Sequence, residues 1–133
     1  MFNKRAVQLF KHCKQVMKRN DLKQLLAIAT VATANAEGFT VQAQTLQPIT
    51  SGYAVAVKDT QNSFGFAGMV NVYNYIQNHP EVNAVGGWFN TDNNLFYFDA
   101  TIVVEDLSTA LELGRMHEQI AIFDLNTLTE IRL

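Results

Sequence analysis

The sequence predicts an α+β domain in which helices cover one face of an antiparallel sheet. Between residues 52 and 125, segments with a two-residue apolar repeat alternate with segments whose apolar residues recur every three or four positions, in the order β-α-β-β-α-β. The clearest two-residue repeat, LFYFDATIVV at 95–104, follows the turn sequence NTDNN. Asn and Asp tolerate left-handed backbone angles, so this pair of segments indicates a hairpin.

The composition fits one folded unit. The chain has 133 residues, of which 48% are hydrophobic and 17% are charged. A chain of this kind can build a packed core without a metal or disulfides. Its single cysteine, Cys13, cannot form an internal disulfide and is compatible with a reducing compartment. We expect a single domain over 1–133, with a helical extension at 1–37 and an α+β core at 38–133.

Residues 2–19 have the pattern of a basic amphipathic helix, with lysines mostly on the polar face. The apolar stripe consists of Phe2, Ala6, Leu9, Cys13 and Val16, widened by Phe10 and Met17. Asn20 or Asp21 is expected to end this helix. Asp21 and Gln24 have the spacing of a capping box for a second helix that stops near Gly38. A strand within residues 22–36 stays an alternative, because their centre reads Ile-Ala-Thr-Val-Ala-Thr.

The first strands of the core follow this helix. An edge strand is expected at 39–49, since Pro48 cannot donate a ladder hydrogen bond. A central strand is expected at 52–57, which is apolar on both faces. Ser63 or Asn62 can cap the next helix, which runs to about Asn78. Its predicted buried stripe is Phe66, Met69 or Val70, Tyr73 and Ile76.

The hairpin at 83–104 completes the pattern. Along its second strand one face carries Phe96, Phe98, Ala100, Ile102 and Val104, and the other carries Leu95, Tyr97, Asp99, Thr101 and Val103. Asp106 is expected to cap a helix at 107–118, followed by a strand at 119–125 and a short edge strand at 127–133. Two right-handed crossovers around a hairpin predict a ferredoxin-like βαββαβ sheet over about 52–125, with both helices on one face.

Charge is distributed unevenly along the chain. Residues 1–24 carry a net charge of +6 and the remainder carries −8, which gives −2 overall. A basic arm on an acidic body can contact phosphates, an acidic partner or the body itself.

Reactive side chains are few. His12, His79 and His117 lie far apart and show no metal-binding spacing, and no Ser stands in a G-x-S-x-G motif. The sequence therefore predicts no metal site, no cofactor and no catalytic residue. It also contains no apolar run long enough to span a membrane, so no membrane association is expected.

Polar residues at three places are candidates for contacting a ligand. Asp99 interrupts an apolar-aromatic strand, where a carboxylate is solvated, paired or part of a site. The loop residues Thr60, Gln61 and Asn62 lie between a central strand and a helix, a position that often carries function. Gln119 begins the last predicted core strand, and its amide can orient a partner.

Four segments resemble small uncharacterised proteins of bacterial mobile elements and phages. They are GFTV, GYAVAVKDTQNSFG, VGGWFN…LFYFDA and QIAIFDL…EI, which fit a G-[FY]-x-V-A…T-Q-N segment, a G-G-W hairpin and an A-I-[FY]-D-L strand over about 38–132. The resemblance implies an accessory role, in interference with host defence or in the phage particle. It places the protein in the cytoplasm of the bacterial host or in the virion, and implies no activity.

The leading functional prediction is a non-enzymatic protein that acts by protein–protein interaction with a host or phage protein, as an inhibitor. Aromatic anchors and basic residues would form the contact. The partner-binding candidates are Lys11, Lys14, Lys18, Arg19, Trp88 and Tyr97. One alternative is nucleic-acid binding through residues 1–24. Another is a small-ligand or enzymatic site around Asp99. Self-association through helix 2–19 or an exposed edge strand is a further prediction.

Overall fold

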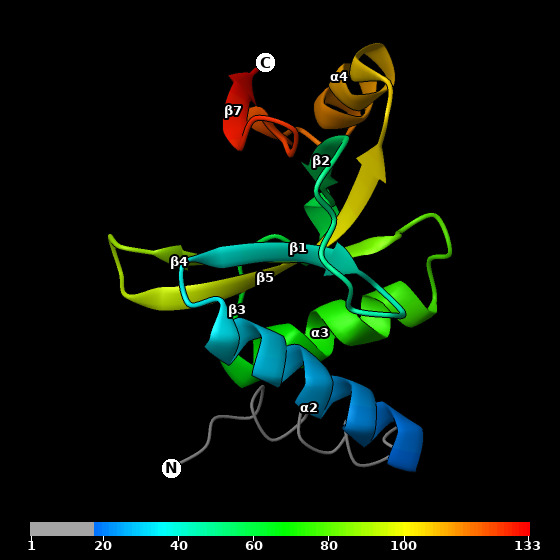
Figure 1. Cartoon of the computed structure of the whole chain (residues 1–133), viewed down its shortest axis with the longest axis vertical. Helices are drawn as coiled ribbons and strands as arrows, with labels where there is room; N and C mark the ends of the chain where they lie inside the picture. Colours follow the sequence, from blue (N-terminus) through cyan, green and yellow to red (C-terminus); the bar gives the residue numbers. More distant parts are fainter. Residues whose placement is uncertain (1–17) are drawn as a thin grey trace.

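The structure is a computed structural model of the chain, and it describes residues 18–133 (Figure 1). The fold is α+β, with three α-helices and a seven-stranded antiparallel sheet in the described part. The elements are, in order, α2 (Arg19–Ala34), β1 (Gly38–Gln42), β2 (Tyr53–Ala56), the 3-10 helix η1 (Lys58–Thr60), β3 (Ser63–Phe64), α3 (Gly65–Gln77), β4 (Ala84–Asn90), β5 (Leu95–Val104), α4 (Leu107–Met116), β6 (Ala121–Asp124) and β7 (Thr129–Arg132).

The sheet extends beyond the four strands predicted for the core. Its order is β1-β4-β5-β2-β6-β7, and the two-residue strand β3 pairs with β5 off this path. Every pairing is antiparallel. The strands predicted within 52–125 form the middle of the sheet, in the order β4-β5-β2-β6. β1 and β7 extend this middle at its two ends.

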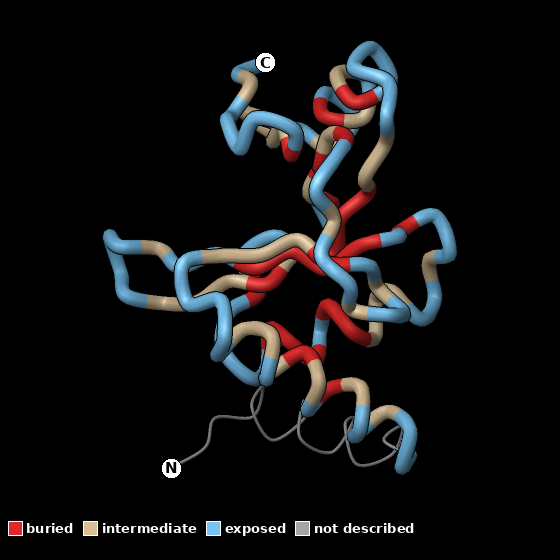
Figure 2. Tube along the Cα trace, in the orientation of Figure 1, coloured by how far each residue is buried: buried red, intermediate tan, exposed pale blue. Residues whose placement is uncertain are grey.

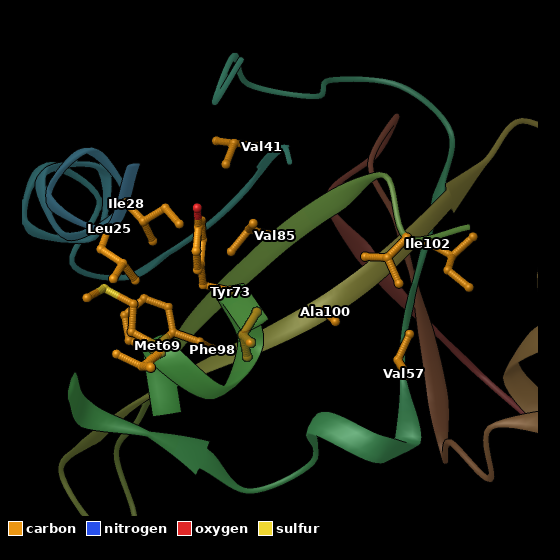
Figure 3. Close-up of a cluster of buried hydrophobic side chains, with 13 residues drawn as sticks. Leu25, Ile28, Val41, Val57, Met69, Tyr73, Val85, Phe98, Ala100 and Ile102 are labelled. Carbon is orange, nitrogen blue, oxygen red and sulfur yellow. The ribbon is translucent and has the colours of Figure 1, made fainter. Parts of the chain in front are cut away.

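All three helices lie on one face of the sheet. Phe98, Ala100 and Ile102 of β5 are buried in a core that contains side chains of α2 and α3. Figure 3 shows this core, with side chains of both helices next to those of β4 and β5. A second cluster beneath α4 is built around Val55 and shares Val104 and Leu113 with the first. The shared side chains place α4 over the same face as α3. The alternation predicted along 95–104 is therefore confirmed.

Helix α2 resolves the ambiguity at 22–36 in favour of a helix, which packs on the core through Leu25 and Ile28. The predicted capping box is wrong, because Lys18 is the N-cap and Asp21 lies three residues inside the helix. The Asp21 carboxylate accepts a hydrogen bond from the Lys18 backbone N–H at 3.1 Å. It also accepts one from the Tyr73 hydroxyl of α3, and burial, with Asp21 beside it, raises the pKa of Tyr73 to about 12. Asp21 thus joins α2 to α3.

Several element boundaries differ from those predicted around β1. Gly38 does not stop α2, since it begins β1, with Ala34 ending the helix. The predicted edge strand at 39–49 is two short segments: β1 ends at Gln42, and the chain turns back so that Pro48 bridges to Val41. A backbone turn that the apolar pattern does not reveal therefore covers the outer edge of β1.

Three further predictions about helices and strands are wrong. Neither Asn62 nor Ser63 caps α3: its N-cap is Phe64, and Ser63 is buried in β3. Phe66 is exposed, so it does not belong to the buried stripe of α3. Gln119 precedes β6 instead of beginning it. In contrast, Asp106 caps α4 as expected, since its carboxylate accepts a hydrogen bond from the Thr109 backbone N–H at 2.9 Å.

The predicted basic helix at 2–19 lies almost wholly outside the described residues. Figure 2 shows that, in the described part, buried residues follow the middle of the sheet and the inner sides of the helices, and that most exposed residues lie in the loops and on the outer sides of the helices. From Lys18 onward, no helix combines the length and the apolar composition that crossing a membrane requires.

The close contact of α3 with β3 gives a stability prediction. A Cβ atom at Gly68 would lie 2.3 Å from the Ser63 carbonyl carbon, which is backbone and cannot rotate away. We expect Gly68→Ala to lower the free energy of unfolding by about 2 kcal/mol or more, although alanine is the better helix former. Urea denaturation followed by the fluorescence of the single tryptophan measures the change.

The neighbouring exposed position supplies the matched control. Ala67→Gly, one residue earlier in the same helix, is expected to cost only about 1 kcal/mol through helix propensity. If Gly68→Ala lowered the free energy of unfolding by no more than Ala67→Gly does, the close contact between Gly68 and Ser63 would be contradicted.

Candidate functional site

The face of the sheet opposite the helices, the outer face, carries the side chains that the alternation of β5 directs away from the core. Tyr97 and Asp99 of β5 lie on this face. Across the β4–β5 pair, Trp88 is opposite Tyr97 and Gly86 is opposite Asp99. Residues that are directly opposite in an antiparallel pair share a face, so register brings these four residues together.

Three aromatic side chains on the outer face form a continuous series, the aromatic row, across three strands. Trp88 of β4 stacks on Tyr97 of β5 with ring centroids 4.8 Å apart and an interplanar angle of 18°. Phe64 of β3 packs against the other side of Tyr97 at 5.7 Å. The row is accessible, since Trp88 is 44% exposed and Phe64 is 48% exposed. The Asn93 amide fixes the row at its centre by donating to the Tyr97 hydroxyl at 2.7 Å.

Asp99 lies partly buried beside the aromatic row. Burial raises the pKa of the Asp99 carboxyl to about 6, and a hydrogen bond with the Trp88 side chain partly opposes this increase. Gly86, directly opposite Asp99, contributes no side chain to this space. A Cβ atom at position 86 would lie 3.0 Å from the Thr101 hydroxyl oxygen and 3.8 Å from the Asp99 Cβ, so the space beside Asp99 is narrow. The carboxylate is thus held next to an indole ring in an environment drier than bulk water.

This arrangement suits a cation. The face of an indole ring attracts a positive charge within about 6 Å of its centroid, and the attraction grows when water is excluded. A carboxylate adjacent to the ring adds a direct ionic contact. Within residues 18–133 the one ion pair joins Lys58 and Glu118, so Asp99 has no cationic partner there. A positive charge from outside would favour the ionised form of Asp99.

The structure brings together three of the residues predicted from the sequence and adds two. Trp88, Tyr97 and Asp99 form one cluster, although the sequence predicts the first two for a partner-binding surface and the third for a ligand site. Phe64 and Gly86 were missed. Phe64 was assigned to the start of a helix, and the two-residue strand that turns its side chain to the outer face is too short to give a periodic signal.

The basic partner-binding candidates do not join this cluster. Lys18 and Arg19 are exposed at the start of α2, which covers the helix side of the sheet. Lys11 and Lys14 lie outside the described residues. The prediction of nucleic-acid contact through residues 1–24 concerns the same region and stays a prediction.

The predicted polar ligand residues have structural roles or lie apart. The Thr60 side chain is fully buried, donating to the Val57 carbonyl at 3.3 Å and accepting from the Ala100 backbone N–H at 3.0 Å. Gln61 and Asn62 are exposed in the turn before β3. The Gln119 amide donates to the His117 carbonyl at 3.1 Å, which orders the end of α4.

Within residues 18–133, no group of three or more His, Cys, Asp or Glu side chains is placed to hold a metal ion.

Comparison of the chain with protein-family models, curated proteins and solved structures finds no match. The resemblance to small phage and mobile-element proteins therefore stays a prediction.

The Thr60 hydroxyl gives a test that separates a structural role from ligand binding. Thr60→Val keeps the shape of the side chain but leaves the buried Ala100 N–H without its acceptor. We expect the free energy of unfolding to fall by about 1–3 kcal/mol. Thr60→Ser retains the hydroxyl and should restore most of this loss. Urea denaturation compares the two variants, and equal stability of Thr60→Val and wild type would refute the role.

The raised pKa of Asp99 predicts a pH-dependent loss of stability. The folded protein holds the Asp99 proton up to about pH 6, whereas the unfolded chain releases it near the ordinary value of 3.8. The folded state thus binds more protons, so the contribution of Asp99 to the free energy of unfolding falls as pH rises from about 4 to about 6.

The Asp99→Asn variant no longer titrates at position 99, and the asparagine side chain keeps nearly the size and shape of the aspartate. We expect the variant to be more stable than wild type at pH 7 by about 1–2 kcal/mol, after allowance for partial solvent screening. The difference should vanish near pH 4. Urea denaturation of both proteins at pH 4 and pH 7 checks this, and a difference that does not change with pH would refute the burial of the carboxyl.

Proposed function

We propose that this protein is a non-enzymatic binding protein whose outer face docks a basic side chain, lysine or arginine, of a partner protein. The observation that carries the proposal is the aromatic row beside a partly buried carboxylate without a cationic partner among the described residues. Trp88 and Tyr97 are the anchors. Asp99 and the Trp88 ring hold the charge.

Exposed aromatic side chains are costly to leave in water, and protein interfaces use them as anchors. Trp and Tyr are enriched among the few residues that dominate binding energy. Here they are already ordered by stacking and by the Asn93 hydrogen bond, so binding would lose little side-chain entropy.

Charge supports a basic partner and disfavours nucleic acid on this face. Residues 18–133 contain twelve acidic and six basic residues. This excess of acidic residues in the described part attracts basic segments over a distance of about a Debye length, roughly 8–10 Å. A phosphate backbone would meet Asp99 and the acidic body, which repel it.

The resemblance in the sequence supplies the biological setting of the proposal. The partner would be a host or phage protein, and the role that of an accessory protein that inhibits a host defence system. The sheet order β4-β5-β2-β6, with α3 and α4 on one face, supports a ferredoxin-like assignment for the core. Such a sheet leaves one face free for contact.

The single tryptophan of the chain makes the proposal directly measurable. We expect a lysine- and glycine-containing peptide to change Trp88 fluorescence with saturation, at a dissociation constant on the order of 1 mM. An acidic peptide of equal length should produce no saturable change. Asp99→Asn should weaken binding of the basic peptide about tenfold.

Phe89 provides the matched control. It follows Trp88 in β4, is similarly exposed at 40%, and lies on the opposite face. Phe89→Ala should leave peptide affinity unchanged, whereas Tyr97→Ala should reduce it. Equal affinity for basic and acidic peptides, or equal effects of the two alanine variants, would disprove the proposal.

A further inference from the structure

The two ends of the sheet differ in how their edges are protected. At β1 the returning chain supplies an outer partner: the Gln42 N–H donates to the Gln47 carbonyl at 2.9 Å, and the Ile49 N–H donates to the Thr40 carbonyl at 3.0 Å. At the opposite end, β6 is the only strand within residues 18–133 that pairs with β7. A free strand edge is a template for pairing with another chain.

The register of β6 and β7 shows which backbone groups are free. The Leu133 N–H donates to the Ile120 carbonyl at 3.0 Å, and the pairing continues through Ile122 opposite Ile131. Hydrogen-bonded pairs alternate in an antiparallel ladder. The N–H and C=O groups of Glu130 and Arg132 therefore point away from β6, toward the free edge.

We infer that two copies of this chain pair through β7 in an antiparallel register centred on Ile131. A two-fold axis at Ile131 places Glu130 of one copy opposite Arg132 of the other, twice. These are the residues with outward backbone groups, so the same register makes four backbone hydrogen bonds and two ion pairs.

Alternative symmetric registers are unfavourable. A register centred on Glu130 sets two carboxylates directly opposite each other, and one centred on Arg132 sets two guanidinium groups opposite each other. Like charges directly opposite across a strand pair are destabilising. Charge therefore selects the register centred on Ile131.

Large apolar side chains are also exposed around β7. Ile120, Leu128 and Leu133 are exposed although they are large and hydrophobic. Ile131 lies on the helix face of β7 in the second core cluster, so the two copies of Ile131 would meet across the axis. A strand of four residues gives a small interface, so the dimer should be weak and reversible.

Sedimentation equilibrium tests the inference on the whole chain, which has a monomer mass of 14.9 kDa. We expect the wild type to shift from monomer to dimer between about 10 μM and about 1 mM. Glu130→Arg and Arg132→Glu should each weaken association about tenfold or more, because each sets like charges opposite each other twice. The double charge exchange should restore it.

A mixture of the two single variants provides the most specific test of the register. The Glu130→Arg chain presents two arginines and the Arg132→Glu chain presents two glutamates, so the mixture should form heterodimers while each alone stays monomeric. A monomeric wild type over the whole range overturns the inference. So do single variants that dimerise like wild type, or a mixture that stays monomeric.

Amide hydrogen exchange on the unmodified chain supplies an independent readout. The Glu130 and Arg132 amides should exchange freely in dilute protein and become protected as concentration rises. The Ile131 and Leu133 amides, which point toward β6, should be protected throughout. Protection of Glu130 and Arg132 that does not depend on concentration overturns the inference. None of these results depends on peptide binding at Trp88.

Discussion

The side-chain alternation of β5 is the constraint on which the rest of the structure depends. This ten-residue strand pairs with β2, β3 and β4, so it sets the register of the middle of the sheet. Its even-numbered residues build the core under α2 and α3, and Val104 links that core to the cluster under α4. Because the period is two, a slip of one residue would exchange the core face with the outer face. The same alternation that buries Phe98 therefore exposes Tyr97.

The outer face keeps features that work against stability. An ionised carboxyl that burial disfavours and aromatic rings left in water both raise the free energy of the folded state. The core would gain nothing from them, since they lie on the other side of the sheet. A Thr or Val at position 99 would suit a half-buried strand without this cost. Folding alone therefore does not account for the aromatic row and Asp99, whereas the proposed binding of a basic side chain would.

Long periodic segments were predictable from the sequence, whereas short and irregular ones were not. The two faces of 95–104, the end of α3 near Asn78 and the Asp106 cap follow from periodicity and capping chemistry, and all three are confirmed. The strand β3 has two residues, too few to show a period. The turn after Gln42 and the buried hydrogen bonds of Thr60 depend on long-range contacts, such as that with Ala100 forty residues away. For the site, Tyr97 and Asp99 on one face were predicted, but joining Trp88 and Phe64 to them required the cross-strand register.

The proposed binding site at the aromatic row and the proposed dimer contact at β7 would act together. A two-fold axis through Ile131 stands perpendicular to the sheet at β7, so next to this axis the outer faces of the two copies lie on the same side. The aromatic rows of the two copies would then be held in a fixed relation by a continuous sheet. A partner with two basic segments could engage both rows, and the second contact would form at the high effective concentration of a linked site. Weak binding at one Trp88 and weak pairing at β7 would then reinforce each other, because occupying both sites requires the dimer. Neither contact needs to be strong alone for the complex to be stable.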